Sequence, residues 1–163
     1  MIDFLSPRPR IVIEAVGPDE ADALADIHAE AFSRSWSADD FAALSGDRRV
    51  FSLGLRRHST FWPPRLVGFV LVRVAADEAE ILSIAVHGAS RGRGHGRLLM
   101  DEALRRLYRE RVESCFLEVD RDNRTAVGLY ESLGFETVGE RKSYYRRDEG
   151  PAGAALVMRL KLR

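Results

Sequence analysis

The chain has 163 residues, of which 45% are hydrophobic, so it is long and apolar enough for one globular domain with a core. Its 25 basic and 25 acidic side chains give a formal net charge of zero, which argues against a protein that coats nucleic acid. The single cysteine excludes an intrachain disulfide and suits a reducing compartment. Neither a signal peptide nor a membrane span is evident in the sequence. We therefore expect a cytoplasmic protein that binds neither membrane nor nucleic acid.

The first half of the chain is predicted to form a strand, two helices and three further strands. A strand over Ile11–Val16 ends at Gly17-Pro18, and residues 19–32 then show the helical period. Ser37, followed three residues later by Asp40, has the pattern of a capping box at the start of a second, short helix. Further strands are expected at residues 49–55, 65–74 and 79–87, with a turn at Asp77-Glu78 and a long polar and aromatic loop over residues 56–65.

The second half is predicted to alternate helix and strand before it ends in two strands. The clearest helix covers Gly96–Arg109, where apolar residues fall on one face. A short strand at Ser114–Val119 is followed by a helix that Asn123 caps and Gly134 ends. The last two strands, which are expected to pair antiparallel, cover residues 136–145 and 153–162.

This order of elements predicts an α/β fold, built on a mixed and mostly antiparallel sheet flanked by helices rather than on repeated βαβ units. We expect a single domain over residues 1–163. Charge is distributed unevenly along it: residues 1–50 carry ten acidic and five basic side chains, whereas residues 91–163 carry twelve acidic and sixteen basic ones. The second half could therefore attract an anion, although solvated surfaces give the same counts.

The six residues "RGRGHG" at Arg91–Gly96 combine glycines and arginines between an apolar strand and a helix. Backbone N–H groups at a helix start are unpaired and partly positive, and glycines let an anion approach them closely. Arg91, Arg93 and Arg97 add full charges, which indicates a phosphate or pyrophosphate site. The alternative is that the glycines only make the turn. A Walker loop would need Lys-Ser or Lys-Thr after the last glycine, and a Rossmann turn would need glycine at position 97.

The pattern Arg91-x-x-Gly94-x-Gly96 resembles the pyrophosphate loop of the GCN5-related N-acetyltransferases (GNAT), which bind acetyl-CoA. The stretch "FLEVDRDNRTAVGLYESLGFETVGERKSYY" at residues 116–145 resembles the second half of that fold, and "HAEAFSRSWSADDF" at residues 28–41 is also similar. Within the family the resemblance is closest to the RimI branch, bacterial enzymes that acetylate the N-terminal alanine of a ribosomal protein. It implies a GNAT domain with acetyl-CoA as co-substrate and no metal.

The resemblance also implies which residues contact coenzyme A. The backbone of Ile84, Ala85 and Val86 would pair with the pantetheine arm, much as an added strand pairs with a sheet edge; a plain core strand explains the same residues. Asn123 would contact coenzyme A while it caps its helix. The residues implied around the pyrophosphate are Arg91, Gly92, Arg93, Gly94, His95, Gly96 and Arg97. We expect no catalytic role for His95, because it is a single histidine without a nearby acid.

Two further residues match the family's proton-transfer groups. Acyl transfer from a thioester to an amine needs a base near the amine and an acid near the departing sulfur. Glu118 lies in an apolar strand and matches the family's proton acceptor; the alternative is a carboxylate that only pairs with a nearby arginine. Tyr130 matches the tyrosine that protonates the coenzyme A thiolate; the alternative is a buried core tyrosine.

The acceptor is expected to be an amine. A peptide α-amine, with a pKa near ~8, loses its proton more easily at neutral pH than a lysine, near ~10.4. A protein N-terminus, such as that of a ribosomal protein, is therefore the favoured acceptor, and the enzyme is expected to be a monomer or weak dimer. A lysine or small-molecule amine as acceptor, and a module that binds coenzyme A without turnover, remain alternatives. Trp36, Trp62, Tyr144 and Tyr145 are candidates for the acceptor groove, with core or loop packing as the alternative for the tryptophans.

Overall fold

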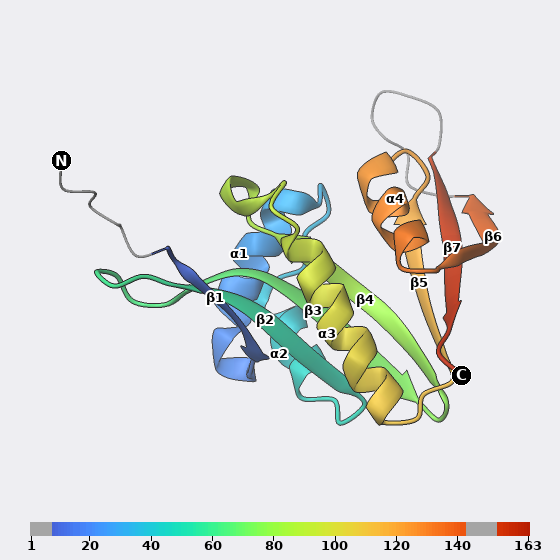
Figure 1. The fold of residues 1–163 in the computed structure, drawn as a ribbon, viewed down its shortest axis with the longest axis horizontal. Helices are drawn as coiled ribbons and strands as arrows, with labels where there is room; N and C mark the ends of the chain where they lie inside the picture. The colour runs from blue at the N-terminus through green and yellow to red at the C-terminus, as the bar shows by residue number, and fades with distance from the viewer. Residues whose placement is uncertain (1–7, 143–152) are drawn as a thin grey trace. The chain divides into compact units, whose positions relative to one another are not determined.

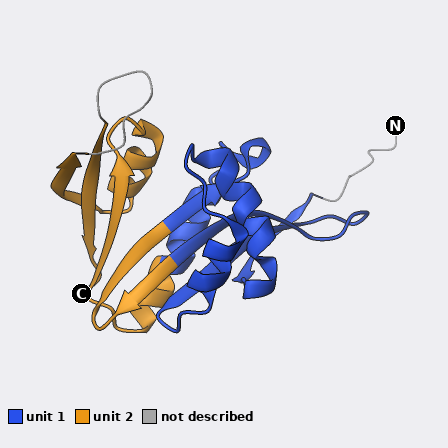
Figure 2. Cartoon of the chain, turned by 180° about the vertical axis from the view of Figure 1, so that it is seen from behind, with its two compact units in different colours: residues 1–71, 83–103 blue, residues 72–82, 104–163 orange. Residues whose placement is uncertain are grey.

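The computed structural model describes residues 8–142 and 153–163, which fall into two compact units (Figures 1 and 2). The first unit takes in the chain up to Leu71 together with Ser83–Ala103, and the second takes in Val72–Leu82 and the chain from Leu104 onward. Strands β3 (Arg65–Ala75) and β4 (Glu78–Val86) and helix α3 (His95–Arg109) each contribute residues to both units. A single domain over residues 1–163 stays a prediction.

The first unit is built on four strands that are hydrogen-bonded in the order β1-β2-β3-β4. Strands β1 and β2 pair antiparallel from Arg10↔His58 to Ala15↔Leu53. This pairing corrects the expected loop over residues 56–65, because residues 56–58 continue β2 beside β1 and the loop shrinks to residues 59–64. The elements of this unit are β1 (Arg10–Ala15), η1 (Pro18–Glu20), α1 (Ala21–Ala31), α2 (Ala38–Ser45), β2 (Val50–His58), part of β3 (Arg65–Ala75), part of β4 (Glu78–Val86), η2 (Gly88–Ser90) and the start of α3 (His95–Arg109).

Helices α2 and α3 cover opposite faces of β3. The ring of Phe41 in α2 packs edge-on against Phe69, with 5.5 Å between the ring centroids. One residue earlier, a Cβ atom placed on Gly68 would lie 3.3 Å from a methyl group of Leu99 in α3. Because successive strand residues point to opposite faces, Gly68 and Phe69 place the two helices on the two sides of the strand. The missing side chain at position 68 is what lets α3 approach so closely.

The turn between α1 and α2 is organised around His28. Its side chain is buried and stacks on the rings of Phe32 and Trp36, with centroid distances of 4.4 and 4.9 Å. The backbone N–H of Trp36 donates to His28 Nδ1 at 3.1 Å, so this nitrogen carries no proton. The predicted capping box follows directly and is confirmed: Ser37 Oγ accepts from the Asp40 N–H, and the Asp40 carboxylate accepts from the Ser37 N–H. Both features fix where α2 begins.

Acidification from about pH 7 to about pH 5 is expected to destabilise the protein through His28. Burial lowers the pKa of His28 below its ordinary value of 6.5, so the unfolded chain binds the proton before the folded chain does. The contribution of neutral His28 to the free energy of unfolding is complete above pH 6.5 and is lost as the pH falls through the pKa of the folded state. The free energy of unfolding then falls by at most about 1.4 kcal/mol per pH unit. Denaturant unfolding checks this: His28→Gln, which does not titrate, should show a shallower loss than the wild type, and an identical slope would contradict it.

The second unit contains strands in the order β3-β4-β5-β7-β6. Strand β5 pairs parallel with β4 from Glu78↔Ser114 to Ile81↔Leu117, whereas β7 pairs antiparallel with both β5 and β6, which gives the predicted mixed sheet. Strands β3 and β4 are joined at Ala76-Asp77, one residue earlier than expected, because Glu78 already belongs to the ladder with β5. The remaining elements are β5 (Ser114–Asp120), α4 (Arg124–Ser132), β6 (Glu136–Lys142) and β7 (Ala154–Lys161).

The predicted antiparallel pairing of the last two strands is confirmed, from Glu136↔Arg159 to Lys142↔Ala154. The end of the first predicted strand, residues 143–145, lies outside the described residues. The side chains of Met158 in β7 and of Cys115 and Leu117 in the neighbouring β5 are almost fully buried. Burial raises the pKa of the Cys115 thiol to about 12, so this cysteine stays a neutral thiol.

Candidate functional site

The segment from β4 to α3 has the backbone of an anion-binding turn. Gly92 and Gly94 adopt φ angles of +74° and +76°, in the left-handed region that residues with a Cβ rarely enter. A Cβ atom built on either glycine would meet nothing within 4 Å, so the space beside the turn is open. These two positions therefore need glycine for the backbone conformation, and the same choice leaves the peptide groups accessible.

The amides at the start of α3 are available to a ligand. The helix begins at His95, and the N–H of Leu98 bonds back to the Gly94 carbonyl at 3.1 Å. Across the described ranges, no protein acceptor is found for the N–H groups of Gly92–Gly96. Arg91, Arg93 and Arg97 are all exposed and bring positive charge to the same short segment. Donors of this kind at a helix start bind phosphate groups well.

His95 and Arg91 have local roles in this turn. Partial burial and the neighbouring Arg93 charge lower the pKa of His95, which keeps the imidazole neutral near pH 7. Arg91 Nε donates to the carbonyl of Val86 at 3.0 Å and so ties the turn to the end of β4.

The β4 residues Ile84–Val86 lie in the strand as predicted, beyond the β4–β5 ladder that ends at Ile81.

Glu118 lies on β5 in the second unit, directly opposite Val157 of β7. Its Oε1 is 3.0 Å from Nε of Arg141 on β6, so the ion pair that the sequence left open as an alternative is present. The Glu118 side chain is 43% exposed, which leaves the carboxylate accessible. Both residues line an open pocket of about 360 Å³ in this unit.

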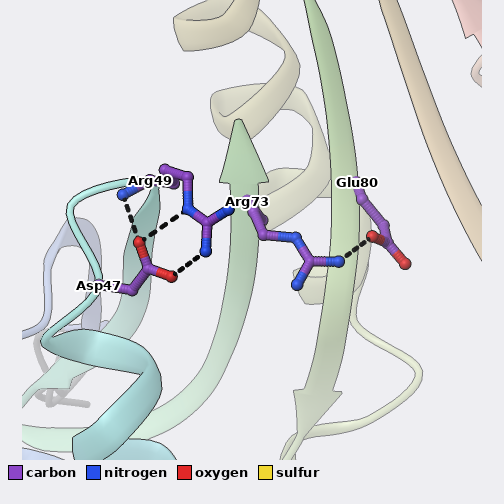
Figure 3. A network of polar contacts seen from close by, with 4 residues as sticks. All are labelled: Asp47, Arg49, Arg73 and Glu80. Carbon is purple, nitrogen blue, oxygen red and sulfur yellow. Dashed lines mark hydrogen bonds and ion pairs between the residues drawn. The ribbon is translucent and has the colours of Figure 1, made fainter. Parts of the chain in front are cut away.

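A second carboxylate in this pocket, Glu80 on β4, was missed by the sequence analysis. Glu80 faces Phe116 across the parallel ladder, and Glu118 follows two residues later on β5, so both carboxylates lie on one face of the sheet. Arg73 of β3 donates to Glu80 Oε2 at 2.6 Å (Figure 3). The signal was available, because Glu80 is an acidic residue within an apolar strand, just as Glu118 is.

Tyr130 and Asn123 are placed by α4. Tyr130 is buried with its ring 6.0 Å from that of Phe135, and burial raises the pKa of its hydroxyl to about 12. Its proton is therefore retained at all ordinary pH values. Asn123 caps the helix as predicted, since its side-chain oxygen accepts from the N–H of Ala126 at 3.2 Å.

The four aromatic candidates for an acceptor groove fall into three groups. Trp36 is partly buried and packs against His28 and Phe41, which supports the packing alternative for this residue. Trp62 is 75% exposed in the loop between β2 and β3, so it is not part of the core. Tyr144 and Tyr145 lie outside the described residues.

Neither a metal centre nor a membrane helix was found in the described part of the chain. Within residues 8–142 and 153–163, no three His, Cys, Asp or Glu side chains gather as metal ligands do. In the same ranges, no helix combines the length and the apolar character that crossing a bilayer requires.

Comparison with known proteins gives consistent matches. Residues 21–135 match the model of the acetyltransferase (GNAT) family. The [ribosomal protein bS18]-alanine N-acetyltransferase of Escherichia coli K12 is 30% identical over 131 residues, which cover 80% of this chain and 84% of that protein. The protein of the same name from Haemophilus influenzae is 29% identical over 147 residues, or 90% and 96% of the two chains.

Solved structures agree on the fold. The crystal structure of the ribosomal-protein-S18-alanine N-acetyltransferase from Escherichia coli superposes with a TM-score of 0.83 at 28% identity, covering 94% of each chain. Arabidopsis thaliana NAA60 in complex with acetyl-CoA gives a TM-score of 0.78 at 19% identity, covering 93% of this chain and 98% of that one.

Proposed function

The chain belongs to the GNAT family and is an acetyl-CoA-dependent N-acetyltransferase, and on this premise we propose that it acetylates the α-amine of a protein N-terminus, specifically an N-terminal alanine of a ribosomal protein. The observation that carries the proposal is the 30% identity, over 80% of this chain, to an enzyme named for that reaction. The acid–base chemistry supports it, since an α-amine with a pKa near ~8 reaches its reactive neutral form near pH 7 far more readily than a lysine does.

The glycine turn is the proposed site for the pyrophosphate of acetyl-CoA. Its N–H groups from Gly92 to Gly96, which have no acceptor among the described residues, fit an anion, and the space beside both left-handed glycines is open to it. The exposed guanidinium groups of Arg93 and Arg97 add attraction. Bound acetyl-CoA supplies the acetyl group as an activated thioester. We place its pantetheine arm along the backbone of Ile84–Val86, where the Val86 carbonyl accepts from Arg91 and has a second lone pair that could accept from the ligand.

Glu118 is the proposed base. It would accept the proton that the amine loses as its nitrogen attacks the thioester carbonyl, directly or through water. Glu118 Oε1 contacts Arg141, but both side chains are exposed, so water weakens the attraction between them. The ion pair and the base role are therefore compatible, provided that Arg141 leaves one carboxylate oxygen free.

Tyr130 is the proposed acid, and Asn123 at the start of the same helix is the proposed contact to coenzyme A. A phenol whose pKa is about 12 keeps its proton and can donate a hydrogen bond to the sulfur as it leaves. Tyr130→Phe is expected to lower kcat by about 100-fold, at the lower end of the usual acid–base contribution, with little change in stability because the ring keeps its packing on Phe135. Steady-state kinetics and thermal melting check this; an unchanged kcat would remove Tyr130 from the mechanism.

The proposal is tested by release of free coenzyme A thiol in the presence of acceptors from different classes. Short peptides beginning with alanine, serine or methionine should be turned over, with alanine preferred. The same peptides with a blocked N-terminus should not be. Turnover of polyamines or of lysine side chains, without turnover of free N-termini, would replace the proposal by the small-molecule or lysine alternative. Binding of coenzyme A with no turnover of any acceptor would indicate a non-catalytic module.

A further inference from the structure

One carboxylate on α1 contacts the segment that leads into the glycine turn. Glu30 Oε2 accepts from the N–H of Gly88 at 2.9 Å, across 58 residues of sequence. Glu30 Oε1 lies 3.2 Å from His87 Nε2, and a guanidinium nitrogen of Arg65 lies 3.0 Å from the same histidine nitrogen. A single nitrogen cannot donate to Glu30 and accept from Arg65 at once, so the bond to Gly88 is the contact that Glu30 keeps in either tautomer.

Gly88 begins η2, the short turn between β4 and the glycine turn. The residue before it, His87, donates its N–H to the Val67 carbonyl of β3 at 2.7 Å, and the N–H of Arg91 bonds back to the Gly88 carbonyl at 3.3 Å. The backbone entering the glycine turn is thus tied to β3 at one residue and to α1 at the next. The glycines beyond it restrict the backbone little by themselves, so these two contacts, together with the bond from Arg91 to the Val86 carbonyl, set where the glycine turn lies.

We propose that Glu30 is a positioning residue for coenzyme binding: its carboxylate holds the Gly88 N–H and thereby prearranges the turn that leads to Arg91–Arg97. Glu30 does not contact the coenzyme in this assignment. The bond is charge-assisted, and a ligand that meets a prearranged loop does not have to order it on binding. The inference rests on the proposed coenzyme site at the glycine turn, and it is independent of which amine is acetylated.

The chain offers a matched control on the same helix. Asp26 lies one helical turn before Glu30, and both line an open pocket of about 260 Å³ in the first unit. No hydrogen bond or ion pair of Asp26 was found in the described part of the structure. Asp26→Ala therefore removes a carboxylate of the same kind without removing the bond to Gly88.

The test compares wild type, Glu30→Ala, Glu30→Gln and Asp26→Ala by calorimetry with coenzyme A and by steady-state kinetics. Glu30→Ala should raise Kd for coenzyme A and KM for acetyl-CoA about tenfold, with kcat nearly unchanged. Glu30→Gln should fall in between, because its amide oxygen still accepts from Gly88 but carries no charge. Asp26→Ala should behave as wild type.

Three results would overturn the inference: an unchanged Kd in Glu30→Ala, an equal loss in Asp26→Ala, or a fall in kcat at constant KM. Exchange of the Gly88 amide hydrogen, followed by NMR without coenzyme, gives an independent reading and should be faster in both Glu30 variants. An exchange rate in the Glu30 variants equal to that of the wild type would also contradict the inference. If wild-type protein binds no coenzyme A, the proposed coenzyme site fails, whereas the exchange experiment still reports on the Glu30 contact.

Discussion

Replacing Glu118 by glutamine is expected to lower kcat by about 100- to 1000-fold while leaving the Kd for coenzyme A unchanged. The glutamine keeps the size and the hydrogen-bonding oxygen of the side chain but cannot take the proton that the amine loses. Part of the rate should return at higher pH, because more of the α-amine is then already neutral. Kinetics at several pH values with a peptide beginning with alanine measures both effects.

Glu80→Gln is the matched control for that experiment. Glu80 and Glu118 lie on the same sheet face in neighbouring strands, each is about half exposed, and each is paired with one arginine. We expect the Glu80 variant to keep its kcat. A loss in Glu80→Gln with full activity in Glu118→Gln would assign the base to Glu80 instead, and full activity in both variants would remove Glu80 and Glu118 from the mechanism.

Gly94→Ala is expected to raise the KM for acetyl-CoA by about 100-fold. Position 94 has a φ of +76°, where a Cβ costs about 1–2 kcal/mol, so the backbone of the turn is displaced or strained. The new methyl group also projects into the open space that we assign to the pyrophosphate. Calorimetry with coenzyme A separates this loss of binding from any change in chemistry, since kcat at saturation should be far less affected.

Gly128→Ala serves as the control for that variant. Gly128 is inside α4, where a Cβ atom would meet nothing within 4 Å and where alanine favours the helix by about 1 kcal/mol. This variant should bind coenzyme A as wild type does and should be slightly more stable. If Gly94→Ala binds coenzyme A equally well, the glycine turn is not the pyrophosphate site.

Local sequence patterns were sufficient for the features that depend on near neighbours. The capping box at Ser37, the Asn123 cap and the helix after the glycine turn follow from side chains within a few residues of each other, and all three are confirmed. The extent of β2 could not be read in this way. Residues 56–58 are polar, and they are held in a strand by pairing with β1, a partner more than 40 residues earlier in the sequence.

The candidate site shows the same limit. The type of residue at Glu118 and Tyr130 and the glycine pattern were visible in the sequence, whereas the partners were not. Arg141 reaches Glu118 only because β6 and β5 both pair with β7. Glu30 reaches Gly88 only because α1 packs beside the end of β4. Contacts of this kind depend on tertiary structure, and no local period or spacing encodes them.

The most direct test is to incubate the enzyme with acetyl-CoA and a peptide that begins with alanine and contains one internal lysine, and to locate the product by fragment-ion mass spectrometry. We predict one acetyl group on the α-nitrogen of the alanine, and none on the lysine. Acetylation confined to the lysine, or a peptide recovered unmodified while free coenzyme A accumulates with a small amine, would contradict N-terminal acetylation as the function of this protein.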